Sequence, residues 1–117
     1  MKLRVNPPIA LESTEFYGRI RLHKGQTTVS GGNQTFTIKP NSLDSVLIVS
    51  IRSADSTGDG CWMLVGVAWY ATKIATGTHN DMPTITLSGD ADNGIKFTWV
   101  TKSSYYKYTA VEICHQW

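Results

Sequence analysis

Residues 85–99 read ITLSGDADNGIKFTW, in which two alternating runs are separated by a short polar segment. In both runs the apolar side chains take every second position, which is typical of a strand with one buried face. The Asn93-Gly94 pair between the runs favours the positive backbone dihedrals of a tight turn. We therefore expect an antiparallel hairpin with its turn within residues 89–94.

The same period of two extends along most of the chain. Residues 16–22 and 35–39 place apolar side chains on one face and polar side chains on the other, and residues 105–114 form a last apolar run. No window sustains the spacing of an amphipathic helix. The sequence predicts an all-β fold, an antiparallel β-sandwich or jelly roll of about seven or eight strands.

Two segments, 46–51 and 61–71, carry apolar residues in both phases of the alternation. Such strands are covered on both faces, and the second cover is either a loop or a neighbouring subunit. Charged residues make up only 17% of the chain, below the roughly 25% of typical domains, which favours a surface hidden in an oligomer. The residues expected at this oligomer interface are Trp62, Met63, Leu64, Val65 and Trp69.

The length of 117 residues indicates one domain, which we place at residues 16–117. Residues 1–15 read as an N-terminal arm or linker, because Asn6-Pro7-Pro8 would interrupt a sheet ladder. The net charge of +2 is spread without basic clusters, so neither nucleic acid nor membrane is an expected partner. No apolar run reaches the length of a membrane span, and the start has no signal-peptide core, so a soluble chain made in the cytoplasm is expected unless a leader was removed.

The sequence contains no recognisable catalytic motif, so we expect neither an enzyme nor a cofactor. The three histidines are far apart, and no nucleophile elbow or phosphate-binding glycine loop is present. Asp55 with Asp59, and Asp90 with Asp92, have spacings that suit calcium, but turns select the same residues, so no metal is expected. Cys61 and Cys114 are expected as buried thiols, and a disulfide between them stays open if their strands are neighbours.

Aromatic residues are the remaining candidates for binding. Trp62, Trp69 and Trp99 fit a core position best, since tryptophan is highly buried on average. The expected ligand-binding residues are the tyrosines in the wetter phase of their strands and three polar loop residues: Tyr17, Tyr106, Tyr108, Asp55, Asp59 and His79. The loops expected to meet a partner are residues 55–60 and 76–81.

One further pattern lies between residues 27 and 114. The strand and turn at 35–42, the apolar strand at 46–50, a Ser/Gly/Asp loop and the apolar run at 62–65 are followed by the Asn-Gly hairpin and a final strand. This plan resembles the C-terminal domains of bacteriophage tail fibres and related virion proteins. The resemblance implies a β-sandwich that trimerises through its doubly apolar strands and presents loops to a bacterial surface receptor, commonly a glycan or an outer-surface protein.

Three functions follow as hypotheses. The first is a non-enzymatic virion adhesion domain that forms a homotrimer and binds a cell-surface receptor. The second is a monomeric carbohydrate-binding module of a secreted enzyme, with an aromatic platform. The third is a structural assembly or decoration protein of the virion, whose interfaces are its function.

Overall fold

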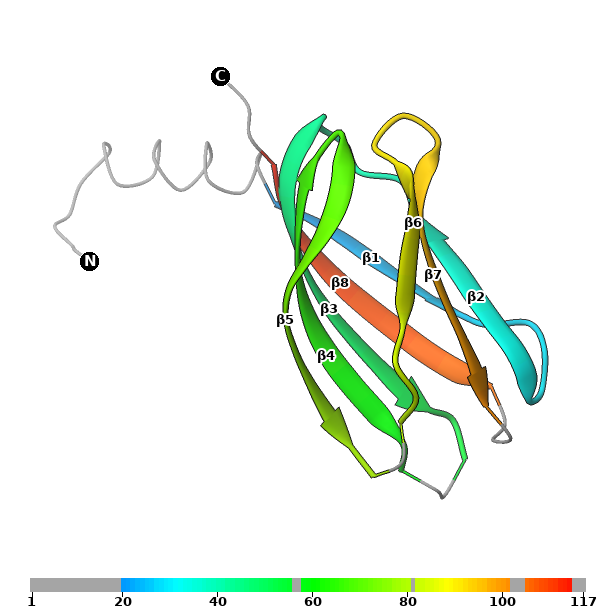
Figure 1. The fold of residues 1–117 in the computed structure, drawn as a ribbon. Helices are drawn as coiled ribbons and strands as arrows, with labels where there is room; N and C mark the ends of the chain where they lie inside the picture. Colours follow the sequence, from blue (N-terminus) through cyan, green and yellow to red (C-terminus); the bar gives the residue numbers. More distant parts are fainter. Residues whose placement is uncertain (1–19, 56–57, 81, 102–104, 115–117) are drawn as a thin grey trace, which may run out of the picture.

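The computed structural model describes residues 20–55, 58–80, 82–101 and 105–114, and in them the chain forms eight antiparallel strands (Figure 1). The strands are β1 (Ile20–Gln26), β2 (Gly32–Ile38), β3 (Asp44–Ser53), β4 (Gly60–Ala68), β5 (Tyr70–His79), β6 (Thr86–Asp90), β7 (Gly94–Thr101) and β8 (Tyr106–Cys114). The described residues contain no helix long and apolar enough to cross a membrane.

The strands follow the order β1-β8-β3-β4-β5-β6-β7-β2. Between β5 and β6 the ladder is reduced to the single pair Tyr70 and Asp90, so the order divides there into a five-stranded and a three-stranded sheet. Figure 1 shows β6, β7 and β2 lying against one face of the other five strands. The expected antiparallel β-sandwich is confirmed.

The hairpin at residues 89–94 is confirmed as the connection between β6 and β7. One carboxylate oxygen of Asp90 accepts hydrogen bonds from the backbone amides of Asp92 and Asn93, at 3.0 and 2.7 Å. Gly94 has a φ of 108°, a value that favours glycine. The aspartate that seemed suited to calcium thus stabilises the turn.

The core fills the space between the two sheets. It includes Phe36, Ile38, Leu47, Val49, Ile51, Cys61, Met63, Val65, Phe97, Trp99 and Tyr106. Phe36 stacks on Phe97 with ring centroids 4.6 Å apart, and on Tyr108 at 3.8 Å. Cys61 and Cys114 are free, buried thiols, which confirms the first of the two alternatives. They do not form a disulfide, and β3 lies between the strands β4 and β8 that carry them.

Two expectations about side-chain burial are wrong. Met63 and Val65 were expected at an oligomer interface, but they are 1% and 0% exposed inside the chain's own core. Trp62 and Trp69 were expected in the core, but they are 51% and 40% exposed. For Trp62, Met63 and Val65 the physical reason is that β4 is apolar in both phases, so the sequence did not reveal which phase faces the second sheet. Trp69 is exposed because it lies in the turn between β4 and β5.

The apolar face of β1 is also the reverse of the expected one. Leu22 is 79% exposed, while His23 turns inward to the carboxylate of Glu112 on β8. β1 keeps its alternation of apolar and polar residues, but the apolar phase faces away from the core. Phe16 and Tyr17, and the expected arm at 1–15, lie outside the described residues.

The connections divide the molecule into two ends. The segments 27–31, 54–59, 80–85 and 102–105 join strands at one end, which we call the loop end. The shorter turns at 69 and 91–93, the 39–43 connection, the start of β1 and the end of β8 lie at the opposite end (Figure 1). The described strands thus enter and leave the fold at the end opposite the loops.

Candidate functional site

The outer face of the five-stranded sheet carries the features that point to binding. Strand register places its side chains in rows that run across the sheet. Two rows, which we call the apolar rows, are Ile20-Ile113-Val46-Gly66-Thr72 and Leu22-Val111-Ile48-Leu64-Ala75. The next two rows toward the loop end, which we call the polar rows, are Lys24-Thr109-Ser50-Trp62-Gly77 and Gln26-Lys107-Arg52-Gly60-His79.

The apolar rows contain no charged residue and expose large side chains. Leu22 is 79% exposed, Ile48 46% and Ile113 41%. A register shift opposite Leu64 leaves Ile74 of β5 without a direct partner, and its side chain, 59% exposed, reaches toward Gly66 of β4. The bulge adds a fourth exposed aliphatic side chain to the same face.

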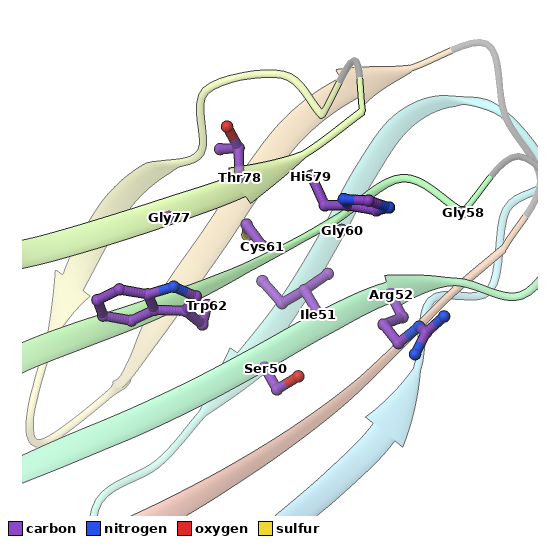
Figure 2. Close-up of a pocket in the computed structure, with 10 residues that line it drawn as sticks. All are labelled: Ser50, Ile51, Arg52, Gly58, Gly60, Cys61, Trp62, Gly77, Thr78 and His79. Carbon is purple, nitrogen blue, oxygen red and sulfur yellow. The ribbon is translucent and has the colours of Figure 1, made fainter.

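The polar rows contain a hollow of about 360 Å³ at the loop ends of β3, β4 and β5. Figure 2 shows Arg52 and His79 at one end of these strands with Gly60 between them, and Trp62 farther along β4. Ser50 lies beside Trp62, as its direct cross-strand partner. The hollow therefore combines one half-exposed aromatic ring with polar groups that can donate hydrogen bonds.

Glycine at position 77 shapes this hollow. The indole of Trp62 lies over Gly77 so closely that a Cβ there would overlap its ring nitrogen. The hydroxyl of Thr76 donates a hydrogen bond to the backbone carbonyl of Trp62 at 3.1 Å and fixes β5 beside it. The ring is thus held flat along the sheet, with about half of its surface in solvent.

The charge of the polar rows is positive. Lys24, Lys107 and Arg52 all have exposed side chains, and the ten residues of these rows include no carboxylate. Among the described residues, none forms an ion pair with Arg52. Two smaller hollows along the same rows are lined by Lys24 and Lys107, and by Lys107 and Arg52, so the concave surface continues across β1, β8 and β3.

Two acidic residues that follow β3 in the chain, Asp55 and Asp59, contact other side chains. Asp55 accepts a hydrogen bond from the hydroxyl of Ser53 at 2.6 Å. Asp59 lies with a carboxylate oxygen 3.5 Å from the hydroxyl of Tyr106, which is buried. Neither of these two contacts involves a residue of the polar rows.

The structure separates the six residues expected to bind a ligand. His79 lines the hollow, whereas Asp55 and Asp59 do not. Tyr106 is 0% exposed, so its expected place on a wet face is wrong; its hydroxyl lies 3.0 Å from Thr101 in the core. Tyr108 is half-buried and its ring stacks on Phe36 at the core, and the residue is among those that line the two smaller hollows. Tyr17 lies outside the described residues.

The residues expected at the oligomer interface are also divided. Leu64 lies in an apolar row, and Trp62 lies in a polar row. Trp69 is at the other end, in the turn between β4 and β5, where its φ is 71°. Its backbone amide donates to Leu43 at 3.0 Å and its carbonyl accepts from Ala91 at 2.6 Å.

Sequence reasoning did not single out Ser50, Arg52 and Gly77. The sequence did contain a signal for the outward face of β3. Ser50 and Arg52 share one phase of this strand with Ile48, and the phase that carries an arginine is expected to face water. Trp62 pairs with Ser50 and must face the same side. The pairing register itself, however, cannot be read from a strand with two apolar faces.

A separate polar cluster joins β1, β8 and the 39–43 connection. The carboxylate of Glu112, 0% exposed, lies 2.8 Å from Nε2 of His23 and accepts from the Asn41 backbone amide at 2.8 Å and side chain at 3.1 Å. Burial raises the pKa of Glu112, but the hydrogen bonds from His23, Asn41 and Cys114 outweigh this and the pKa lies below its ordinary 4.5. These contacts of Glu112 link β8 to β1 and to the 39–43 connection, and we call this group the Glu112 cluster.

The two thiols have raised pKa values. Burial raises the pKa of Cys61 to about 11, against the opposing charge of Lys73. Burial and the neighbouring charge of Glu112 raise the pKa of Cys114 to about 11. Across the described residues, no group of three or more His, Cys, Asp or Glu side chains gathers at a point where a metal ion would fit.

Comparison with known proteins gives one similarity. No family model matches the sequence, and no curated protein matches it. Among solved structures, the chain is similar to the tailspike protein of the Acinetobacter phage vB_ApiP_P1, with a TM-score of 0.46 and 15% sequence identity. The match covers 80% of this chain and 21% of the tailspike chain, so this chain spans about a fifth of that protein's length.

Proposed function

We propose that this chain is a non-enzymatic virion adhesion domain of the tail-fibre kind, which self-associates through its apolar rows and binds a receptor on a bacterial surface at its loop end. The observation that carries the proposal is the pair of uncharged, exposed apolar rows on the outer face of a sheet whose other face already forms the core. A soluble domain rarely leaves such a face uncovered.

The exposed area is large enough to matter energetically. Leu22, Ile48, Ile74 and Ile113 are 41–79% exposed, and full burial of such a side chain is worth about 2 kcal/mol. Covering their exposed fractions therefore supplies about 4 to 5 kcal/mol per copy. This amount supports stable association once several copies contribute.

A second copy of the same chain is the best occupant of this face. A different protein partner usually adds complementary charges at the contact, whereas the apolar rows present none of either sign. Copies of one uncharged face can also close around a threefold axis without like-charge repulsion, and three is the number of copies that the resemblance to tail-fibre domains implies. We propose a homotrimer.

The loop end is then left for the receptor. The connections 27–31, 54–59, 80–85 and 102–105 and the hollow beside Trp62 lie at that end, and the described strands enter and leave at the other. Loops held at one end of a rigid sheet scaffold commonly carry binding residues.

The proposal is tested by measuring mass and cell binding together. Light scattering should give about three times the chain mass of 12.9 kDa. Ile48→Lys should yield folded monomers, because a charge would be buried without a partner, while Val100→Lys, at a position 63% exposed on β7, should remain trimeric. Labelled trimers should bind susceptible bacterial cells, and the Ile48→Lys monomer should bind them more weakly because it loses multivalency.

A monomeric carbohydrate-binding module is the second candidate, and the exposed ring of Trp62 in a hollow favours it. It places the chain outside the virion, as part of a secreted protein, and predicts a monodisperse wild-type monomer. A purely structural virion protein predicts the trimer mass without binding to cells. The same two measurements therefore separate all three functions.

A further inference from the structure

The polar rows have the chemistry of a saccharide site, and their charge selects one class of saccharide. We infer that the loop-end hollow and the two smaller hollows beside it bind an acidic oligosaccharide, one whose sugars carry carboxylates. This inference rests on the proposed function for the source of the ligand, a polymer of the bacterial surface, and on the geometry of the rows for everything else.

Trp62 supplies the platform. Its indole is 51% exposed, lies along the sheet over Gly77 and is flanked by the hydroxyl of Ser50 in the same row. A flat apolar ring with hydrogen-bonding groups at its edge matches the apolar face and polar rim of a pyranose. Gly77 is required for this arrangement, because any side chain there would displace the ring.

Arg52 supplies the charge selection. It is a diagonal neighbour of Trp62, which corresponds to about 7–8 Å between their backbones. Its exposed guanidinium has no ion-pair partner among the described residues, so a ligand carboxylate can take the bidentate geometry that arginine favours. His79 lies across Gly60 from Arg52 and adds a further hydrogen-bonding group.

The length of the surface points to a chain of sugars. From His79 on β5 to Lys107 on β8 the row crosses three strand intervals, about 14 Å at the usual strand spacing. Lys107 and Lys24 line the hollows that continue beyond Arg52. Cations at successive positions, with a single aromatic ring, suit a charged polymer that repeats along its length.

The test is a titration of the whole chain with three acidic trisaccharides: trigalacturonate, trimannuronate and α2,8-linked trisialate. Each is paired with its carboxyl-reduced, neutral form. Binding is read from the indole N–H resonance of Trp62, assigned by its loss in Trp62→Phe, and by isothermal titration calorimetry for the variants, because Trp62→Ala lacks this resonance. We expect at least one acidic probe to shift this resonance, its neutral form to bind at least about tenfold more weakly, and added salt to weaken the acidic complex.

Two pairs of variants locate the site. Arg52→Gln and Trp62→Ala should each weaken binding about tenfold or more, since each removes a charge-assisted hydrogen bond or a stacking surface. The matched controls are Lys96→Gln, an exposed lysine on β7, and Trp69→Ala, the exposed tryptophan at the opposite end, and both should bind as the wild type does.

The inference is overturned if no acidic probe shifts the Trp62 resonance, if neutral and acidic forms bind equally, or if Arg52→Gln has no effect. Equal binding of a single-stranded oligothymidylate would also overturn it, because the rows would then be a general polyanion surface. Failure of the adhesion proposal is distinguishable: a chain that binds an acidic trisaccharide but no bacterial cell keeps the site and loses the proposed function. A chain that binds cells equally well as wild type and as Trp62→Ala keeps the proposed function and loses the site.

Discussion

Replacement of Glu112 by glutamine should weaken the Glu112 cluster, which links β1, β8 and the 39–43 connection. The carboxylate accepts from the backbone and side chain of Asn41 and pairs with His23, all within 3.1 Å. A hydrogen bond to a charged acceptor is worth about 1 kcal/mol more than a neutral one, and the amide of glutamine can serve only part of these donors. The free energy of unfolding should fall by about 2–3 kcal/mol, which lowers the Tm by about 10 °C for a chain of this size.

The pH dependence checks the same reasoning independently. Because the pKa of Glu112 is depressed in the folded state, its stabilisation is fully present above its ordinary value of 4.5 and is lost as pH falls below it. Thermal melts from pH 7 to pH 3 should therefore show the wild type losing part of its advantage over Glu112→Gln in the acid range. Asp92→Asn, an exposed carboxylate in the β6–β7 turn, is the control and should melt as the wild type does at pH 7. A Glu112→Gln variant within about 0.5 kcal/mol of the wild type at pH 7 would refute the argument.

Three other predictions concern the turn, the thiols and the hollow. Asp90→Ala should cost about 1–2 kcal/mol in chemical denaturation, because two backbone amides lose their acceptor; an unchanged midpoint would contradict this role. Cys61 and Cys114, with pKa values of about 11, should have about a hundredfold less thiolate than ordinary thiols and should react with iodoacetamide only after unfolding; rapid labelling of the native chain would show that the thiols are accessible. Gly77→Ala should move the indole resonance of Trp62 and weaken saccharide binding without a large loss of Tm, and an unmoved resonance would contradict the placement of the ring over residue 77.

The fold was predictable from the sequence because its signals are local. The alternation in residues 85–99 and the Asn93-Gly94 pair act within a few residues, and the hairpin forms as they indicate. The buried cysteines followed from apolar neighbours in the same way. What local signals could not supply is the choice of face: β4 is apolar in both phases, so only its pairing with β3 places Met63 inside and Trp62 outside.

The candidate site depends on register between distant strands, and this limited its prediction. His79 was expected in a loop at residues 76–81; residues 76–79 instead form the end of β5, from which His79 lines the hollow. Arg52 and Ser50 reach the same place only because β3 pairs with β4 in one particular register. Tyr106 was misplaced for the same reason: its phase in β8 follows from the pairing of β8 with β1 and β3, two strands that lie far from it in the sequence.

The mass of the chain in solution tests the central proposal most directly, since the apolar rows have a function only if another copy covers them. Multi-angle light scattering of the wild type, Ile48→Lys and Val100→Lys distinguishes association through the apolar rows from non-specific aggregation. The proposal predicts about three times 12.9 kDa for the wild type and Val100→Lys, and a folded monomer for Ile48→Lys. A wild-type monomer, or a trimer that Ile48→Lys leaves intact, would contradict it.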